Sequence, residues 1–140
     1  MSDCVFCDIA QGSSDASFLY RDEEIAVFMD IDPVNPGHLL VIPNAHAARL
    51  HDLDPHVGGR MFELAQKMAR ALYRSGLKCE GVNFFLADGE AAMQGVFHIH
   101  LHVFPRFTGD GVLKFDESDY SRPDRSELEQ NALMIRRNLT

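Results

Sequence analysis

A run of alternating side chains between Val96 and Phe104 constrains this chain more than any other segment. Its sequence is VFHIHLHVF, in which histidines and apolar residues take turns. Side chains of a β-strand point alternately to the two faces of its sheet. The run therefore predicts a strand over residues 96–106, with four residues on an apolar core face (Phe97, Ile99, Leu101 and Val103) and three histidines on the other (His98, His100 and His102).

Shorter signals on either side predict the remaining elements. Four further strands are expected at residues 18–21, 25–30, 38–43 and 81–86, each bounded by turn-forming residues. A long helix is expected to begin after Asp54, a preferred N-cap, with Pro55 at its first position, and to end at Gly76. Its apolar residues recur three and four positions apart, which is typical of one buried stripe: Val57, Met61, Leu64, Met68 and Leu72.

The order of these elements predicts the fold class. Residues 4–10 are expected to form a helical turn, and a last amphipathic helix is expected with apolar positions at Leu128, Ala132, Ile135 and Leu139. The resulting order favours an α+β fold, in which an antiparallel sheet of about five strands carries the helices on one face. A length of 140 residues suits a single domain over residues 1–140. Its core is expected at about 4–107, followed by a C-terminal extension with a helix at about 124–139.

Charge and termini exclude several classes of protein. A formal net charge of −8 argues against binding to DNA or RNA polymers, which takes basic patches. The N-terminus, MSDCVFCDIAQGSSD, lacks the basic and apolar regions of a signal peptide. No apolar run approaches the roughly 18 residues of a membrane helix. We therefore expect a soluble cytoplasmic protein, in which the pair Cys4 and Cys7 is more typical of a metal half-site or redox pair than of a disulfide.

Three histidines on one strand face indicate a functional site. A solvated strand face is the plain alternative, but it gives no reason to use titratable, nucleophilic rings. A site with all three on one metal ion is disfavoured, because alternate strand residues rarely converge on a tetrahedral ion. An imidazole whose Nδ1–H is held by a carbonyl presents a free Nε2 lone pair. His100 would then attack an α-phosphorus to give a nucleotidyl-histidine that water hydrolyses, while His102 donates to phosphate oxygens or the leaving group.

The segment HIHLHVF resembles the signature of the histidine triad (HIT) superfamily. CVFCDI, AVFMDIDPVNPGHLLVIPNAH and DGEAAMQGVFHIHLHVFPRF extend the resemblance, in order, over residues 4–107. It implies an α+β fold, a homodimer and a nucleoside pocket under each triad. It also implies hydrolysis of a purine nucleoside phosphoramidate or a dinucleoside polyphosphate, with release of a nucleoside monophosphate such as AMP.

By position, the resemblance implies roles for individual residues. His100 would be the nucleophile, His102 and Gln94 would contact the phosphate, and His38 would support the triad. Asp30 matches a residue that binds the ribose hydroxyls, although a carboxylate before Asp32 and Pro33 is also typical of a turn. The full substrate-binding set is Phe6, Ile9, Phe28, Asp30, Ile31, His38, Leu40, Gln94, Gly95 and His102, in which Phe6, Ile9 and Leu40 line the base pocket.

Three positions depart from the common pattern of the superfamily. Gly95 stands where many members have Ser or Thr, Met93 replaces a frequent Gly, and Ala87 a frequent Asn or Gln. The missing hydroxyl at residue 95 removes a donor to a charged group, worth about 1 kcal/mol. These departures bear on the rate and the leaving group rather than on the type of reaction.

The resemblance also implies a structural Zn²⁺ ion, bound by Cys4, Cys7, His46 and His98. Two thiolates and two neutral imidazoles would complete a tetrahedron. The alternative is a pair of reduced thiols, with His46 on the surface.

Two other functions stay open. One is a zinc-stabilised nucleotide-binding or interaction protein with little turnover, for which nucleotide binding would survive His100→Ala. The other is a thiol redox protein that uses Cys4 and Cys7. Within the enzyme hypothesis, Arg106 is the main candidate to bind a long polyphosphate. The scarcity of other basic residues near the motifs favours a substrate with one phosphate.

Overall fold

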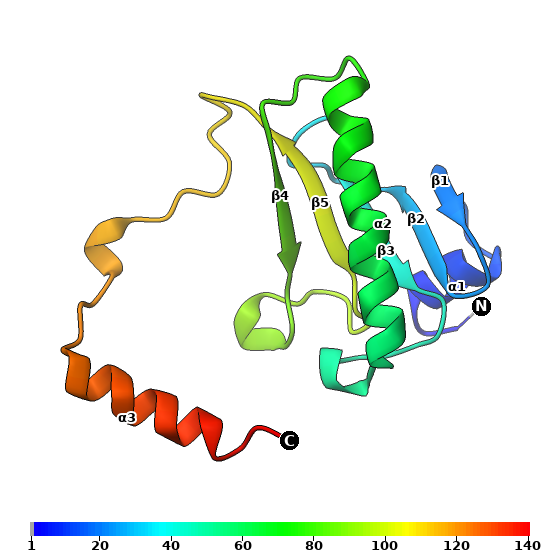
Figure 1. Cartoon of the computed structure of the whole chain (residues 1–140). Coiled ribbons are helices and arrows are strands. Elements are labelled where there is room, and N and C mark those ends of the chain that lie inside the picture. The colour runs from blue at the N-terminus through cyan, green and yellow to red at the C-terminus, as the bar shows by residue number, and fades with distance from the viewer. Residues whose placement is uncertain (1) are drawn as a thin grey trace.

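The fold is an antiparallel sheet with a long helix on one face, as predicted. The computed structural model describes residues 2–140, and Figure 1 shows the whole chain. The strand order is β1-β2-β3-β5-β4, with every pair antiparallel. The strands are β1 (Phe18–Arg21), β2 (Ile25–Met29), β3 (Leu39–Pro43), β4 (Gly81–Leu86) and β5 (Leu101–Arg106). The helices are α1 (Val5–Gln11), α2 (Pro55–Arg74) and α3 (Arg125–Arg136), and single 3-10 turns lie at η1 (Leu50–Asp52), η2 (Glu90–Ala92) and η3 (Glu117–Asp119).

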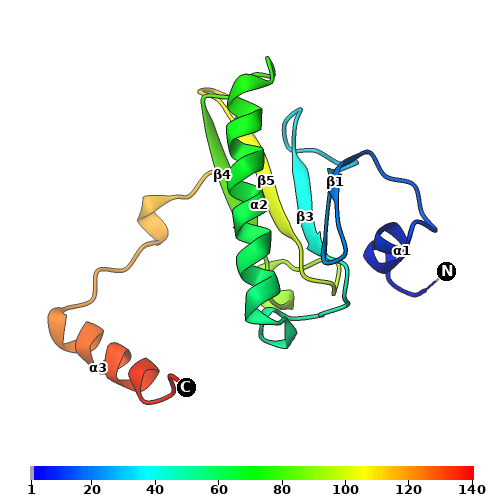
Figure 2. The same cartoon turned by 45° about the vertical axis from the view of Figure 1, so that its right-hand side comes forward.

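Helix α2 begins and packs as its sequence predicts. The Asp54 carboxylate accepts the N–H of His56 at 2.9 Å, and Pro55 occupies the first helical position. The helix runs along one face of the sheet (Figures 1 and 2). Its apolar stripe closes the main core, whose buried members include Val27, Val41, Met61, Leu64, Leu72, Leu101 and Val103.

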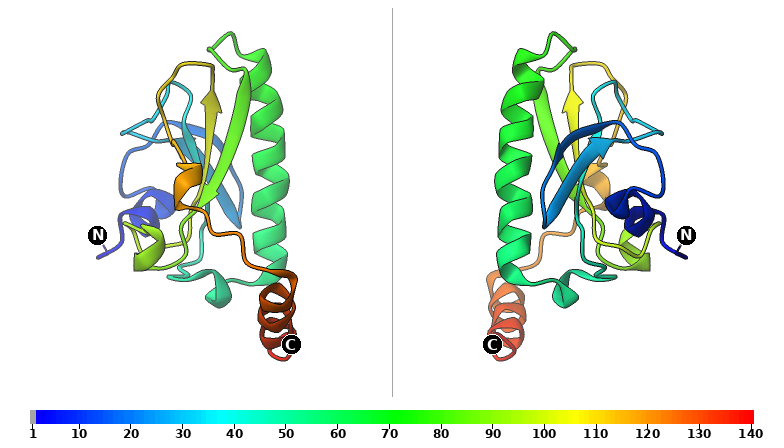
Figure 3. Two further views of the ribbon diagram at one scale, coloured as in Figure 1. Left: turned by 90° about the vertical axis from the view of Figure 1, so that its left-hand side faces the viewer. Right: turned by 90° about the vertical axis from the view of Figure 1, so that its right-hand side faces the viewer.

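Helix α1, for which the sequence predicted a helical turn without a position on the sheet, lies on the opposite face of the sheet from α2 (Figure 3). The cause is visible in β2 and β3, where both faces of the strands are apolar and buried. The second apolar face needs a cover of its own. The α1 residues Phe6 and Ile9 provide it, packing with Ala26, Phe28, Leu40 and Ile42 in a second core cluster.

The histidine-rich run forms a shorter strand than predicted. Strand β5 begins only at Leu101, which pairs with Val41 of β3 and Leu86 of β4. Before that point the main chain bonds elsewhere: the N–H of Ile99 donates to the carbonyl of Ala47 at 2.8 Å. Ile99 is buried in the core, whereas Phe97 is 47% exposed, contrary to its predicted place on the core face.

The chain after β5 leaves the body of the molecule (Figure 1). Helix α3 has an N-cap at Asp124, whose carboxylate accepts the N–H of Glu127, and it ends at Arg136, before the predicted residue 139. None of its residues is buried. Over residues 2–140, no helix is long and apolar enough to cross a membrane.

Candidate functional site

A cavity of about 560 Å³ opens on the face of the sheet that carries α1. Phe6 stands in its wall, with its ring centre 5.8 Å from that of Phe28 and 4.9 Å from that of His100. The cavity brings together all but one of the predicted substrate-binding residues: Phe6, Ile9, Phe28, Asp30, Ile31, His38, Leu40, Gly95 and His102, with His100 beside them. Apolar and aromatic surface therefore meets a group of imidazoles in one place.

The main chain fixes the tautomer of His100. Its Nδ1 lies 2.8 Å from the carbonyl oxygen of His98, and a carbonyl only accepts, so Nδ1 carries the hydrogen. The lone pair is then on Nε2. Burial lowers the pKa of His100, while the hydrogen bond to His98 and the charge of Asp30 oppose that shift. A neutral ring with a free lone pair is a competent nucleophile near pH 7.

A second chain of contacts fixes the tautomer of His102. The N–H of Val34 donates to Nδ1 of His38 at 3.1 Å, so the hydrogen of the neutral His38 ring lies on Nε2. That Nε2 is 2.9 Å from Nδ1 of His102, which accepts and leaves the hydrogen of His102 on its own Nε2. Desolvation by burial lowers the pKa of His38, and that of His102 to about 4, where the neighbouring rings His100 and His38 add to the shift.

The two adjacent rings thus carry complementary groups. The ring centres of His100 and His102 are 4.8 Å apart, closer than the alternation of a regular strand would place them. His100 offers a lone pair and His102 offers an N–H. A nucleophile beside a hydrogen-bond donor is suited to attack at a phosphorus whose oxygens gain charge.

Asp30 takes part both in a turn and in the cavity. Its Oδ1 accepts the N–H of Asp32 at 2.8 Å, which is the turn anticipated from the sequence. Its Oδ2 lies 3.3 Å from Nε2 of His38 and 3.9 Å from Nδ1 of His102. The carboxylate therefore faces the imidazole pair while it stabilises the loop that follows β2.

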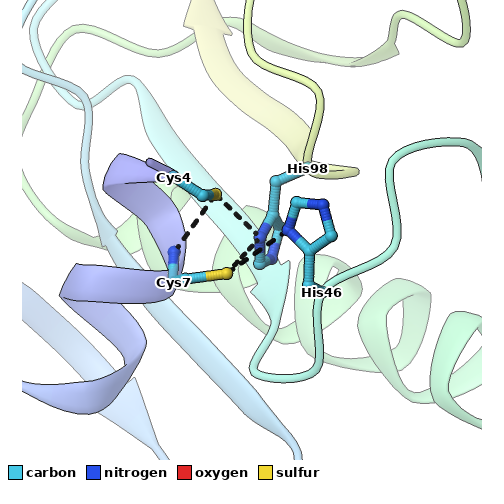
Figure 4. Close-up of side chains that lie close together, drawn as sticks. All are labelled: Cys4, Cys7, His46 and His98. Carbon is cyan, nitrogen blue, oxygen red and sulfur yellow. Dashed lines mark hydrogen bonds between the residues drawn. The ribbon is translucent and has the colours of Figure 1, made fainter. Parts of the chain in front are cut away.

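A second cluster joins α1 to the segment before β5 (Figure 4). Nδ1 of His98 lies 3.4 Å from Sγ of Cys4 and 3.5 Å from Sγ of Cys7, and Nδ1 of His46 lies 3.3 Å from Sγ of Cys7. Tetrahedral zinc ligands stand roughly 3.4–3.8 Å apart, given the usual Zn–N and Zn–S bond lengths. Nε2 of His98 is 2.8 Å from the carbonyl of Pro43, to which it donates, so the Nδ1 lone pair faces the thiols.

The protonation chemistry of this cluster also fits a cation. Desolvation by burial, together with Cys4, raises the pKa of the Cys7 thiol to about 11. Thiolates are the form that binds metal, and a divalent ion offsets the cost of crowding them. The four donor atoms lie within 4.8 Å of one another, and the residues present fit a zinc ion.

A third group, formed by Asp30, His38 and His102, is equally compact but has the wrong hydrogen-bond pattern for a metal. A histidine that binds a metal usually donates its other ring N–H to an acceptor. Nδ1 of His38 instead accepts the N–H of Val34, so a metal on Nε2 would have to displace its only proton. This group is a hydrogen-bond relay.

Two residues singled out from the sequence do not face the cavity. The buried Gln94 side chain accepts the N–H of Gly89 at 2.7 Å and donates to the carbonyls of Ala48 and Val96, so a contact with phosphate would require it to leave these bonds. The Arg106 guanidinium is held by both oxygens of Asp110, so its expected role in binding a polyphosphate is wrong. Within residues 2–140, no Lys or Arg lines the cavity.

Sequence reasoning missed the residues that set the relay. Val34 acts through its main-chain N–H, which every residue except proline carries, so no signal in the sequence marks it. Asn35 is buried beside it, and its amide donates to the carbonyl of Pro105 and to Asp110. An Asn between two prolines is typical of a turn, but here its side chain also links the loop to the end of β5 through hydrogen bonds.

The HIT domain family model matches residues 11–109 of the chain. Adenylylsulfatase HINT3 of Arabidopsis thaliana is 33% identical over 105 residues, which are 75% of this chain and 53% of that protein. Among solved structures, a zinc-bound histidine triad family protein from Mycobacterium smegmatis is 42% identical, with a TM-score of 0.76 over 91% of this chain and 88% of that one. The Streptococcus mutans protein SMU.412c is 35% identical, with a TM-score of 0.89 over 100% of this chain and 87% of that one.

Proposed function

Because the chain belongs to the HIT domain family, we propose that it is a nucleotide hydrolase or transferase that works through a covalent nucleotidyl-His100. The observation that carries this proposal is the pair of fixed tautomers. The carbonyl of His98 leaves a lone pair on Nε2 of His100, and the relay through His38 leaves an N–H on Nε2 of His102. The named activity of the Arabidopsis relative, an adenylylsulfatase, supports chemistry at an adenylyl phosphate.

The reaction has two displacements. In the first, a bond forms between Nε2 of His100 and the α-phosphorus as the bond to the leaving group breaks. In the second, the oxygen of a water molecule or another acceptor bonds to phosphorus and gives up its proton, and the bond to Nε2 breaks. The group expelled in the first displacement leaves with the bonding electron pair and takes up a proton, so that the overall reaction balances. The imidazolium of the intermediate keeps its Nδ1–H on the carbonyl of His98. His102, as a neutral ring, suits hydrogen bonding to the phosphate oxygens, where charge develops.

The cavity suits a purine mononucleoside derivative. Phe6, Ile9 and Leu40, with Phe28, would hold the base between apolar walls, and Asp30 would accept hydrogen bonds from the ribose hydroxyls. Without Lys or Arg in the wall formed by residues 2–140, a long polyphosphate would lack counter-charges. This favours a substrate with one phosphate, such as adenosine phosphoramidate, over a dinucleoside polyphosphate.

We assign the Cys4, Cys7, His46 and His98 cluster to a structural Zn²⁺ ion. When bound, the ion would supply a closed four-ligand site with no open position for substrate. These ligands join α1, which carries Phe6, to the segment that carries His100. The zinc-bound relative from Mycobacterium smegmatis supports this assignment.

We propose that the protein is a single domain over residues 1–140 and forms a homodimer. Strand β4 is an edge of the sheet, and the exposed rings of Phe84 and Phe62 lie 5.8 Å apart beside it. An edge strand next to an exposed apolar pair is an interface that a second copy can cover.

The proposal is tested by incubating the protein with adenosine phosphoramidate and, separately, with diadenosine tetraphosphate, while AMP release and protein mass are measured. His100→Ala runs beside His51→Ala, a matched change of an exposed histidine. We expect AMP and an adenylyl adduct from the wild type and His51→Ala, and neither from His100→Ala. If neither substrate is turned over but AMP still binds, the enzyme hypothesis fails, and the protein is instead a zinc-stabilised nucleotide-binding protein.

A further inference from the structure

The cavity crosses the sheet from the imidazoles at β5 to the chain segment that precedes β1. His100 and His102 stand at one end of it, and residues 14–16, between α1 and β1, line the same cavity. The strand order places β5 three strands from β1 (Figure 1), which is about 14 Å at the usual spacing of neighbouring strands. A mononucleotide with its α-phosphorus at His100 can therefore extend across β3 and β2 towards this segment.

Residues 14–16 close the apolar end of the cavity. The N–H of Met29 donates to the carbonyl of Ser17 at 2.9 Å, which holds the end of this segment against β2. Ala16 packs on the second core cluster, whose apolar side chains form the walls proposed for the base. A base held between those walls would turn its outer edge to the first two residues of the segment.

Asp15 is the residue of this segment that can discriminate between bases. Its side chain is exposed, and the ion pairs of residues 2–140 do not include it. A carboxylate only accepts hydrogen bonds, whereas the hydroxyl of Ser14 both donates and accepts. Asp32 also lines the cavity, but it lies in the loop after β2, next to Asp30, whose carboxylate faces the imidazole pair. The outer edge of the base would therefore meet a group that requires donors.

We propose that Asp15 gives the cavity a preference for guanine over adenine, an inference that rests on the proposed function. Guanine carries two donors side by side, N1–H and the N2 amino group, which the two carboxylate oxygens can accept together. Adenine offers the N6 amino group beside the lone pair of N1, so one carboxylate oxygen would face a lone pair. Hypoxanthine keeps N1–H and lacks the N2 amino group, so it would make one of the two bonds.

The test compares kcat/KM for the phosphoramidates of guanosine, inosine and adenosine. We expect the wild type to favour guanosine over adenosine about tenfold, with inosine between them, because a bidentate contact to the base is lost in two steps. Asp15→Asn should bring the three values close together, since an amide can both donate and accept. Asp32→Asn removes the same charge at the other end of the cavity and should keep the wild-type ratios. Equal values in the wild type, or a preference that survives Asp15→Asn, would overturn the role of Asp15.

Binding of the products separates this inference from the proposed reaction. Isothermal titration calorimetry with GMP, IMP and AMP needs no turnover, and the dissociation constants should rise in that order. If no phosphoramidate is hydrolysed but Asp15 still sets this order, the reaction fails and the base preference stands. If the phosphoramidates are hydrolysed with equal kcat/KM and the products bind equally, the base preference fails and the reaction stands.

Discussion

Nε2 of His38 lies 2.9 Å from Nδ1 of His102, and this contact decides which nitrogen of His102 presents a proton to the cavity. The N–H of Val34 on the other nitrogen of His38 makes the direction of the relay unambiguous. Through it, a main-chain group outside the triad orients the donor that stands beside the proposed nucleophile, His100.

Removal of the relay should slow the reaction without preventing binding. His38→Ala leaves Nδ1 of His102 without its donor, so the ring can adopt the opposite tautomer. We expect kcat to fall about 10- to 100-fold, as for other supporting residues, with a small change in KM. His38→Gln, whose amide can donate, should recover part of kcat. The measurement is steady-state kinetics, with His56→Ala as the control because His56 is exposed. A wild-type kcat in His38→Ala would contradict the relay.

Acid should destabilise the protein through His102. Its pKa is about 4 when folded and about 6.5 when unfolded, so the unfolded state binds a proton first as the pH falls. The stability is therefore complete above about pH 6.5 and is lost towards pH 4, by up to about 3 kcal/mol from this group. Urea unfolding at several pH values should show a shallower acid loss for His102→Gln than for the wild type. His51→Gln, at an exposed site, should match the wild type, and equal slopes for all three would refute this source of acid lability.

Removal of zinc should lower the thermal stability. Free zinc at a hundred times its dissociation constant stabilises a folded protein by about 3 kcal/mol, which corresponds to a Tm shift on the order of 10 °C for a chain of this size. Chelation should lower the Tm of the wild type and of Cys79→Ser, whose thiol lies outside the cluster, but not that of Cys7→Ser. Elemental analysis should find one zinc per chain, and a metal-free wild type with the same Tm would rule out the structural ion.

A hydroxyl at residue 95 should strengthen the contact with phosphate. A Cβ on Gly95 meets no atom within 4 Å, and the residue lines the cavity, so serine fits without strain. One added hydrogen bond of about 1 kcal/mol predicts a roughly fivefold rise in kcat/KM for Gly95→Ser. Gly81→Ser is the control, since Gly81 is equally open but lies at the start of β4, outside the cavity. An equal or lower kcat/KM for Gly95→Ser would show that the main-chain N–H already serves.

The backbone at Met93 suits a glycine, the residue that the family resemblance led us to expect there. Its φ of 70° is in the left-handed region, which costs a residue with a Cβ roughly 1 kcal/mol. Met93→Gly should therefore leave the unfolding free energy unchanged or raise it slightly, because relief of strain offsets the greater entropy of the unfolded chain. Thermal unfolding measures the change, and Met134→Gly is the comparison, because a glycine inside helix α3 should lower the stability. A clear loss of stability in Met93→Gly would mean that the methionine side chain contributes contacts of its own.

Local rules were sufficient for the elements whose signals are complete in the sequence. Helix α2 carries its own cap at Asp54 and its own stripe, and each depends only on residues a few positions apart. The family resemblance likewise brought together the cavity residues and the four residues of the proposed zinc cluster. The positions of the Gln94 and Arg106 side chains were not predicted, because no motif identifies their hydrogen-bond partners, Ala48 and Asp110.

The sequence by itself therefore determined the class of fold, the long helix and the histidines for which we propose a reaction. Strand alternation alone placed the three histidines on one face, and it is the tertiary structure that turns His98 to the thiols, as the family resemblance implied, while His100 and His102 line the cavity. Alternation along a strand holds only where neighbouring strands pair with the main chain, and pairing begins at Leu101. The tautomers were decided in the same way, because each depends on a main-chain donor or acceptor that folding brings to an imidazole and that no side-chain pattern records.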